Sequence, residues 1–348
     1  MKTNAFRGKD FFTLMDLSKE EIEAYLEVAE ELKKQKIMGV RHSELLKDKS
    51  LFLFFYNRST RTRNSFETGM TQLGGHANFL DTNKIYTPAL EGLEKAYSTE
   101  RVSDTARVLS RIGDGIAIRC YGDSVGWKYG AAHGLIREFA KWADIPVINM
   151  EDDKFHPTQA LADGLTIKEK FGCYEGLNFV MSWAYSPSTQ KPRAVPQSSI
   201  ILATKLKMNV TLAYPEGMEL DEEYISYCQD LARKNNSRFE ISHDFKDSFK
   251  DAHIVYPKAW APWVLFQPPV GNASEQEAQE IFDKNRDWRF DSSIFEITSR
   301  DAIYMHCLPA DRGFEATDEV MDGERSVIFD QAENRLHTIK ALLTLHLA

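Results

Sequence analysis

The sequence has few cysteines, and the four that it has lie far apart, at Cys120, Cys173, Cys228 and Cys307. None forms a CxxC pair or has a histidine at the spacing of a zinc site, so neither a disulfide scaffold nor a zinc motif is predicted. No apolar run approaches the roughly 20 residues that a membrane helix needs. Because the N-terminus also lacks the apolar core of a signal peptide, we expect a cytoplasmic protein that does not act at a membrane.

Positive charge is in deficit as well, because 43 lysines and arginines face 52 aspartates and glutamates, for a net charge of −9. A broad basic face for nucleic acid is therefore not expected. No GxGxxG motif follows a strand and no GxxxxGK[ST] motif occurs, which disfavours dinucleotide and P-loop nucleotide enzymes. An acidic protein can still bind a small anion where a few positive side chains converge.

Short apolar runs that alternate with amphipathic stretches dominate the 348 residues. This alternation predicts an α/β fold of two doubly wound parallel-sheet domains joined by helices. Strands are expected over 50–56, 76–81, 115–121, 146–150, 177–183, 209–214, 239–242, 253–256 and 302–307. Helices are expected over 18–33, 64–73, 102–112, 131–143, 157–170, 195–206, 222–234, 245–251 and 333–347.

The pattern restarts near Met150, so we expect one domain over 1–150 and a second over 151–332. The helix over 157–170 would join the two domains, and the last helix, 333–347, would pack back on the first. The stretch 262–289 contains Pro268-Pro269 and polar segments, and it is expected to form an irregular surface excursion.

Three arginines, Arg58, Arg61 and Arg63, stand between an apolar strand and an amphipathic helix in the segment Asn57-Arg-Ser-Thr-Arg-Thr-Arg63. The start of a helix leaves backbone N–H groups unpaired and favours an anion, and guanidinium groups add donors in a fork. The segment therefore predicts a phosphate-binding cradle. A solvated basic turn with an ordinary helix cap remains the alternative.

Further candidate site residues follow strands or begin helices. His156 precedes Pro157, which suits the first position of a helix, so His156 and Gln159 would lie at an open helix end. Cys307 and Leu308 follow an apolar strand, as does Arg119, and ligands bind beyond the carboxyl ends of parallel strands. The alternatives are a structural helix cap for His156, a core position for Cys307, and ion pairs for Arg119 and Arg335.

Several segments, taken in order, resemble the aspartate/ornithine transcarbamylase family over nearly the whole chain. They are Ser59–Arg63, Asp104–Arg111, Asp114–Arg119, His156–Asp163, His306–Pro309 and Ala332–Arg335. The resemblance implies carbamoyl phosphate as a substrate, no cofactor and no metal. It also implies a homotrimer with shared active sites, in which the segment Thr82–Glu100 would reach into a neighbour's site.

The same resemblance implies roles for individual residues. Ser59, Thr60, Arg61 and Thr62 would hold the phosphate, and Arg119, His156 and Gln159 would surround the carbamoyl group. The carbonyls of Cys307 and Leu308, together with Arg335, would complete that pocket. The residues expected to take part in catalysis are Arg61, Thr62, Arg119, His156, Gln159, Cys307 and Arg335.

The regions expected to bind the second substrate resemble a narrower group, the knotted transcarbamylases. These include the N-acetylornithine and N-succinylornithine enzymes and a related group of unassigned specificity. The likeness rests on the proline-rich segment Ala184–Gln197 and on His253–Pro262, which lacks the Ser-Met-Gly of ornithine enzymes. It implies a knot in the second domain and a second-substrate site formed by Lys258, Trp260, Tyr185 and Pro187. Asp311 stands where the N-acetylornithine enzymes have a basic residue.

We therefore expect a carbamoyltransferase that moves the carbamoyl group of carbamoyl phosphate to an amino group. The amine attacks directly, while the site stabilises the oxyanion and the departing phosphate. The acceptor would be a small amino acid or an acylated diamine. Ornithine carbamoyltransferase proper is the alternative within enzymes, and a non-catalytic protein that binds a phosphometabolite is the alternative outside them.

Overall fold

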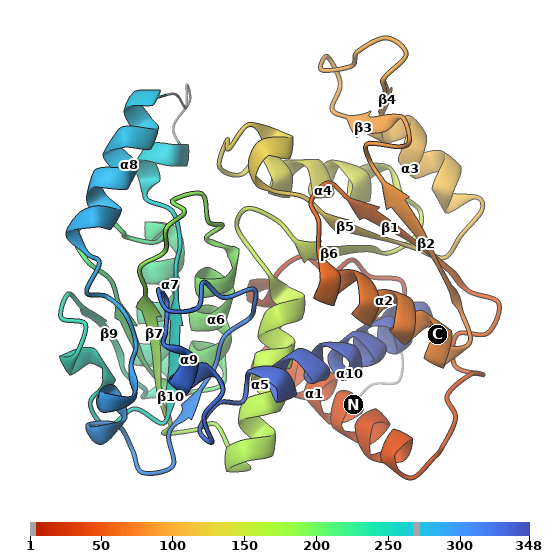
Figure 1. Ribbon diagram of the computed structural model, residues 1–348. Coiled ribbons are helices and arrows are strands. Elements are labelled where there is room, and N and C mark those ends of the chain that lie inside the picture. Colours follow the sequence, from red (N-terminus) through yellow and green to blue (C-terminus); the bar gives the residue numbers. More distant parts are fainter. Residues whose placement is uncertain (1–4, 267–271) are drawn as a thin grey trace. The chain divides into compact units, whose positions relative to one another are not determined.

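The computed structural model describes residues 5–266 and 272–348 (Figure 1). Its contacts divide the chain into two compact units. The first unit comprises residues up to Val125, Tyr129–Ala162 and Asn334–Ala348, and the second comprises Gly126–Lys128 and Asp163–Glu333. Each unit has a parallel sheet flanked by helices, which confirms the predicted α/β fold class. The predicted knot stays a prediction.

The sheet of the first unit has four parallel strands in the order β2-β1-β5-β6. They are β1 (Ser50–Phe55), β2 (His76–Asp81), β5 (Gly115–Arg119) and β6 (Val147–Glu151). Phe55 is paired with Arg119, and Arg119 with Glu151, so three neighbouring strands end at one edge. Residues that follow these strands are therefore brought together although they are far apart in the sequence.

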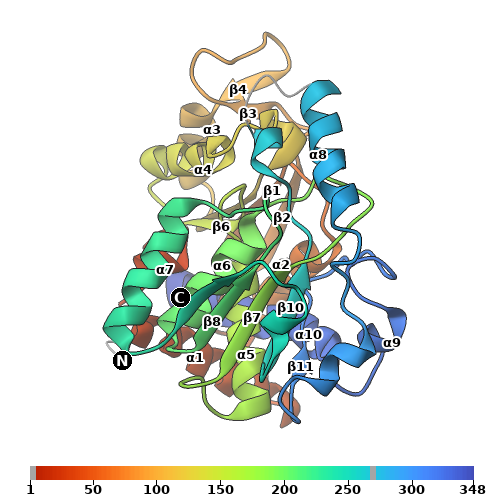
Figure 2. The same ribbon diagram turned by 90° about the vertical axis from the view of Figure 1, so that its left-hand side faces the viewer.

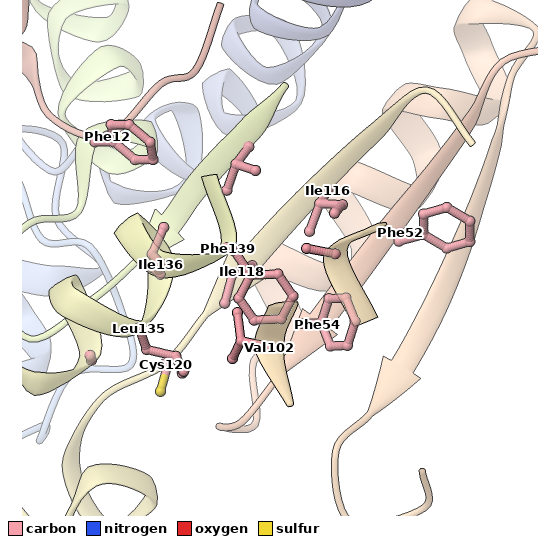
Figure 3. Close-up of a cluster of buried hydrophobic side chains, with 13 residues drawn as sticks. Phe12, Phe52, Phe54, Val102, Ile116, Ile118, Cys120, Leu135, Ile136 and Phe139 are labelled. Carbon is pink, nitrogen blue, oxygen red and sulfur yellow. The ribbon is translucent and has the colours of Figure 1, made fainter. Parts of the chain in front are cut away.

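Helices cover both faces of this sheet (Figure 1). On one face, α3 (Val102–Ser110) and α4 (Ala131–Trp142) pack on the sheet through an apolar core that includes Phe54, Ile118 and Phe139 (Figure 3). On the other face lie α1 (Lys19–Ile37), α2 (Thr60–Leu73) and the last fifteen residues of the chain, Asn334–Ala348. A capping box formed by Ser18 and Glu21 begins α1, in agreement with the helix expected over 18–33.

The sheet of the second unit has five parallel strands in the order β11-β10-β7-β8-β9 (Figure 2). They are β7 (Asn178–Trp183), β8 (Asn209–Ala213), β9 (Phe239–Ser242), β10 (Ile254–Lys258) and β11 (Ile303–Tyr304). The helices of this unit include α6 (Ala194–Lys205), α7 (Glu222–Asn235), α8 (Asn272–Lys284) and α9 (Asp318–Met321). Lys258 is paired with Trp183, so the segments after β7 and β10 begin side by side.

Two long helices run from one unit into the other. The division falls within α5 (Pro157–Phe171), between Ala162 and Asp163, and within α10 (Ile328–Leu347), between Glu333 and Asn334. In the described part of the chain, no helix is long and apolar enough to cross a membrane.

Several predicted elements differ from the structure. The helix expected over 245–251 was wrong, because only the 3-10 turn Asp247–Phe249 forms there. The stretch 262–289 is not wholly irregular, because it contains α8, which buries Ala278 and Phe282 four residues apart. Its Pro268-Pro269 lies outside the described residues. Helices α2 and α10 begin earlier than predicted, at Thr60 and Ile328, and the short pair β3 (Thr87–Ala89) and β4 (Thr99–Arg101) was not predicted.

Candidate functional site

The ends of β1 and β5 are fixed to each other by one asparagine. The Asn57 side chain donates to the carbonyl of Tyr121 at 3.0 Å and accepts the Tyr121 N–H at 2.8 Å. This reciprocal pair sets the direction in which the chain leaves both strands. It therefore positions the start of α2 beside the end of β5.

Helix α2 begins directly after that asparagine with an ordinary side-chain cap. Ser59 is in an extended conformation, and its Oγ accepts the Thr62 N–H at 3.1 Å. The cap confirms that the arginine-rich segment is a helix start, with Arg61 and Arg63 in its first turn. A helix start of this kind presents backbone N–H groups and a positive dipole to an anion.

The buried Thr62 hydroxyl joins three distant segments of the first unit. Its Oγ1 accepts from Arg335 Nη2 at 3.1 Å and from Arg119 Nη1 at 3.4 Å. Arg335 also donates to Gln159 Oε1 at 2.7 Å and to Thr158 Oγ1 at 3.3 Å. The structure therefore brings together residues that the sequence places up to 273 positions apart.

A buried glutamate that sequence reasoning missed completes this cluster. Glu151, the last residue of β6, accepts from Arg119 Nη1 and lies 3.1 Å from His156 Nε2. Arg119 also donates to the Tyr121 hydroxyl at 2.7 Å. His156 Nδ1 lies 3.2 Å from Thr158 Oγ1, whose own proton goes to the Met150 carbonyl at 2.9 Å.

The electrostatics of the cluster are dominated by burial and positive charge. Burial, together with the charges of Arg335, Arg119 and Arg61, holds the pKa of His156 well below its usual range. Burial raises the pKa of Glu151, although Arg119 and Arg335 act in the opposite direction. His156 is therefore neutral at pH 7, and it can donate or accept a single proton without adding charge.

The three arginines of the predicted cradle do not act as one group. Arg58 and Arg63, with Ser59 and Thr60, line a cavity of about 650 Å³, whose wall also includes Lys84. Arg63 is paired with Glu67 at 3.0 Å and stacks 3.6 Å over the ring of Phe79. Arg61 does not line this cavity, and its charge is one of those that lower the pKa of His156.

A second polar cluster lies in the second unit, at the ends of β10 and β11. Buried Lys258 donates to Glu315 Oε1 at 3.2 Å and to the Ala259 carbonyl at 3.0 Å. Glu315 Oε1 also accepts the Ala259 N–H at 2.7 Å, and its Oε2 accepts the Asp311 N–H at 2.8 Å. Burial alone would raise the pKa of Glu315, but Lys258 and His306 hold it well below its usual range.

The same glutamate faces the segment that carries Cys307 and Leu308. His306 Nε2 lies 3.2 Å from Glu315 Oε2, and His306 Nδ1 accepts the Leu308 N–H at 2.9 Å. Leu308 has a φ of +56°, which is uncommon for a side chain of its size. The hydrogen bond to His306 holds the backbone in this conformation, and so it fixes the direction of the neighbouring carbonyls.

The other predicted second-substrate residues differ in exposure. Trp260 is fully buried, and its ring N–H donates to the Met218 carbonyl at 2.7 Å. Tyr185 is buried, with its N–H bonded to the Trp288 carbonyl at 2.8 Å, whereas Pro187 is exposed. In the same unit, Asp311 Oδ2 accepts from Lys191 Nζ and from Ser186 Oγ, both at 2.6 Å.

Glu151 and Glu315 are the residues that sequence reasoning did not single out. Each is a buried carboxylate at or beyond the end of a strand, which is the position used to select Arg119 and Cys307. For Glu151, the available signal was a charged residue at the end of a mostly apolar strand, Val147–Glu151. In residues 5–266 and 272–348, no group of three or more histidines, cysteines or acidic residues could hold a metal ion.

Comparison with known proteins gives a consistent assignment. Residues 9–169 match the carbamoyl-P binding domain of aspartate/ornithine carbamoyltransferases, and residues 191–346 match their Asp/Orn binding domain. An ornithine carbamoyltransferase of Thermococcus kodakarensis is 38% identical, with 97% of this chain and 96% of the relative covered.

Solved structures agree with this match. The ornithine carbamoyltransferase of Pyrococcus furiosus is 38% identical, with a TM-score of 0.82 over 98% of this chain and 97% of the other. An acetylornithine transcarbamylase in complex with acetylcitrulline is 32% identical, with a TM-score of 0.89 over 98% and 99%. The chain therefore belongs to the aspartate/ornithine carbamoyltransferase family.

Proposed function

We propose that this carbamoyltransferase holds carbamoyl phosphate on the first unit and transfers the carbamoyl group to the amine of a small amino acid or an acylated diamine. The observation that carries the proposal is the convergence of Thr62, Arg119, His156, Gln159 and Arg335 in one hydrogen-bonded cluster. A solved relative, an N-acetyl-L-ornithine transcarbamylase variant, is described in complex with carbamyl phosphate.

The phosphate is bound at the start of α2. Ser59, Thr60 and Thr62 supply hydroxyls, the N–H groups at the start of α2 that the Ser59 cap does not use add donors, and Arg61 adds a guanidinium group. A helix dipole and charge-assisted donors both favour a dianion. The same positive charge stabilises the departing phosphate. The negative charge on the phosphate grows as its bond to the carbamoyl carbon breaks.

The carbamoyl oxygen is bound by Arg119, His156 and Thr62. As the amine attacks, this oxygen becomes an oxyanion, and donors that are already fixed need no rearrangement to stabilise it. Glu151 orients Arg119 and His156 through the contacts described above. Gln159 and Arg335 bind the carbamoyl amide, and the roles of Cys307 and Leu308 in this site stay predictions.

The second substrate is bound by the second unit through Lys258. Lys258 uses two of its three N–H donors on Ala259 and Glu315, so one donor is left for a substrate carboxylate. Tyr185, Pro187 and Trp260 stay predictions as further second-substrate residues. Relatives are named for ornithine and for acetylornithine, and true ornithine carbamoyl transfer is the second candidate.

Assembly and location are also proposed rather than established. We propose a homotrimer in which residues 82–100 contribute to a neighbouring subunit's site, and a cytoplasmic location. Sedimentation velocity of the purified chain tests the trimer, because a monomer or dimer at micromolar concentration would contradict it.

A carbamoylation screen tests the proposed function. The enzyme is incubated with carbamoyl phosphate and one amine at a time: ornithine, its N-acyl derivatives, lysine, putrescine, aspartate or 2,3-diaminopropionate. We expect a ureido product and one phosphate per turnover with at least one amine. If no amine reacts although carbamoyl phosphate binds, the chain is a phosphometabolite-binding protein instead.

A further inference from the structure

The turn between β6 and α5 carries two residues of the cluster in the first unit, Glu151 before it and His156 after it. Between them lies Asp152, which is fully buried. Its Oδ1 accepts the N–H groups of Lys154 at 2.7 Å and Phe155 at 2.5 Å, and its own N–H donates to the Phe155 carbonyl at 2.8 Å. Asp152 therefore closes the turn on itself, and this closure fixes the spacing between Glu151 and His156.

The second oxygen of Asp152 anchors the closed turn to the rest of the first unit. Oδ2 accepts from Asn149 Nδ2 at 2.8 Å and lies 2.7 Å from His133 Nδ1, which belongs to α4. The Asn149 amide also donates to the Phe12 carbonyl at 3.0 Å. One carboxylate therefore joins β6, α4 and the turn, and four donors fill its two oxygens.

The tautomer of His133 follows from its other partner. Arg137 Nε donates to His133 Nε2 at 3.3 Å, and a guanidinium group has no acceptor. The Nδ1 atom of His133 therefore carries the proton and donates to Asp152. The Arg137 guanidinium carbon lies 4.2 Å from the centre of the Phe12 ring, and Arg137 Nη2 lies 3.7 Å from Asp16 Oδ2. The carboxylate is thus held by a histidine whose own orientation is fixed.

We propose that Asp152 is a positioning residue for carbamoyl transfer. It holds Glu151 and His156 at the separation at which Glu151 Oε2 lies 3.1 Å from His156 Nε2 and also accepts from Arg119. Asp152 acts through these neighbours rather than on the substrate. The inference rests on the proposed function, in which Arg119 and His156 bind the carbamoyl oxygen.

Replacing Asp152 by asparagine breaks this arrangement with almost no change in the size of the side chain. An amide has one oxygen, so either the two N–H groups of the turn or the Asn149 and His133 donors meet an NH2 group that cannot accept. A loosened turn lets the His156 imidazole move, and a misplacement of about 1 Å can lower a rate by about 100-fold. In the described part of the chain, none of the four donors to Asp152 belongs to α2, so phosphate binding at the start of α2 is spared.

The test measures kcat with the amine that reacts in the carbamoylation screen, together with the inhibition constant of inorganic phosphate. We expect Asp152→Asn to lower kcat by about 10- to 100-fold and to leave the phosphate constant unchanged. Asp152→Glu keeps the charge but is one methylene longer, so it should lower kcat by about 10-fold as well. Asp153→Asn is the matched control, because Asp153 is also buried but accepts the His133 N–H at 3.1 Å, at the start of α4. It removes the same charge one residue further along and should leave kcat near that of the wild type.

Several results would overturn the inference while the proposed function stands. One is a kcat for Asp152→Asn close to that of the wild type. Another is an Asp152→Glu enzyme as active as the wild type, which would mean that the charge matters and its position does not. An equal loss of kcat in Asp153→Asn, or a loss of phosphate binding in parallel with kcat, would mean that Asp152 supports only the fold.

A second variant decides the matter if Asp152→Asn does not fold. His133→Ala removes one donor to Asp152 Oδ2 from a partly exposed side chain, and kcat should fall by about 3- to 10-fold. An unchanged kcat in this variant would overturn the inference. If no amine reacts with the wild-type enzyme, the proposed function fails, and the inference fails with it.

Discussion

The two polar clusters of this protein differ in how their charges balance. In the first unit, the charges of Arg61, Arg119 and Arg335 act on His156, and Glu151 is the carboxylate bound to Arg119. In the second unit, Lys258 is matched by Glu315 and Lys191 by Asp311. Several positive side chains therefore act on one place in the first cluster, whereas each lysine of the second is paired with a carboxylate.

The arrangement of charge in each cluster indicates which ligand it can bind. Positive side chains that converge at a helix start favour an anion, so the first cluster favours a doubly charged ligand such as carbamoyl phosphate. A balanced cluster gains nothing from a net charge and favours a ligand that has both signs or neither.

Replacing Arg119 by glutamine should have the largest effect. Arg119 is the donor that we place on the developing oxyanion, and removal of one such donor lowers kcat by about 100- to 1,000-fold. Steady-state kinetics at saturating substrates measure the loss. Lys49→Gln, which removes a half-exposed cation paired with Asp114, is the control and should leave kcat near that of the wild type. A kcat for Arg119→Gln within threefold of the wild type would remove Arg119 from the reaction.

Replacing Lys258 by methionine should act on the acceptor alone. The loss of one charge-assisted bond is expected to raise KM for the amine by about 10- to 100-fold, with KM for carbamoyl phosphate unchanged. Because the change leaves Glu315 without its lysine, the unfolding transition of the variant is recorded alongside the kinetics. An effect confined to carbamoyl phosphate would contradict the assignment of Lys258.

Glu151→Gln removes the negative charge from the first cluster. It removes the carboxylate bound to Arg119 but keeps the shape of the side chain, so Arg119 and His156 lose part of their orientation. We expect kcat to fall by about 10-fold while the affinity for phosphate stays the same or rises, because the cluster becomes more positive. Phosphate inhibition constants check this. Weaker phosphate binding in the variant would mean that the net charge of the cluster does not govern anion affinity.

Stability should depend on pH through buried histidines in both units. Burial lowers the pKa of four of them, His42, His156, His306 and His346, the last to about 4. Each is neutral when folded and takes up a proton on unfolding below about pH 6.5, so stability falls as the pH falls. Carboxyls with raised pKa values act in the opposite direction, namely Asp10, Glu151 and Asp153, the last at about 6.

The histidines outnumber these carboxyls, so we expect the Tm to fall between about pH 7.5 and pH 5.5. Thermal unfolding followed across this range measures the slope, and His346→Asn should reduce the slope by up to one proton. A Tm that rises on acidification would show that the carboxyls dominate.

The fold and most of the first cluster could be predicted from local patterns. Alternating apolar and amphipathic stretches specify parallel sheets, and the ends of parallel strands locate Arg119 and Cys307. The arginine-rich segment could be placed between a strand and a helix, although the helix was expected from residue 64 and begins at Thr60, after the Ser59 cap.

The features that were not predicted depend on contacts between residues that are far apart in the sequence. Glu151 and Glu315 are glutamates whose roles come from partners such as Arg119 and Lys258, which are 32 and 57 residues away. Only Arg58, which precedes α2, and Arg63 line the cavity, while Arg61 of the first helical turn does not, and the spacing of the three in the sequence does not show this. Helix α8 was obscured by its polar composition, since tertiary packing rather than propensity buries Ala278 and Phe282.

The most direct test of the charge contrast is a calorimetric titration of the wild-type chain and Arg61→Ala with carbamoyl phosphate, without any amine. We predict saturable binding below about 1 mM for the wild type, with affinity at least 10-fold weaker in Arg61→Ala and an unchanged unfolding temperature of the free variant. No binding to the wild type at several millimolar, or equal affinity in both proteins, would contradict the account.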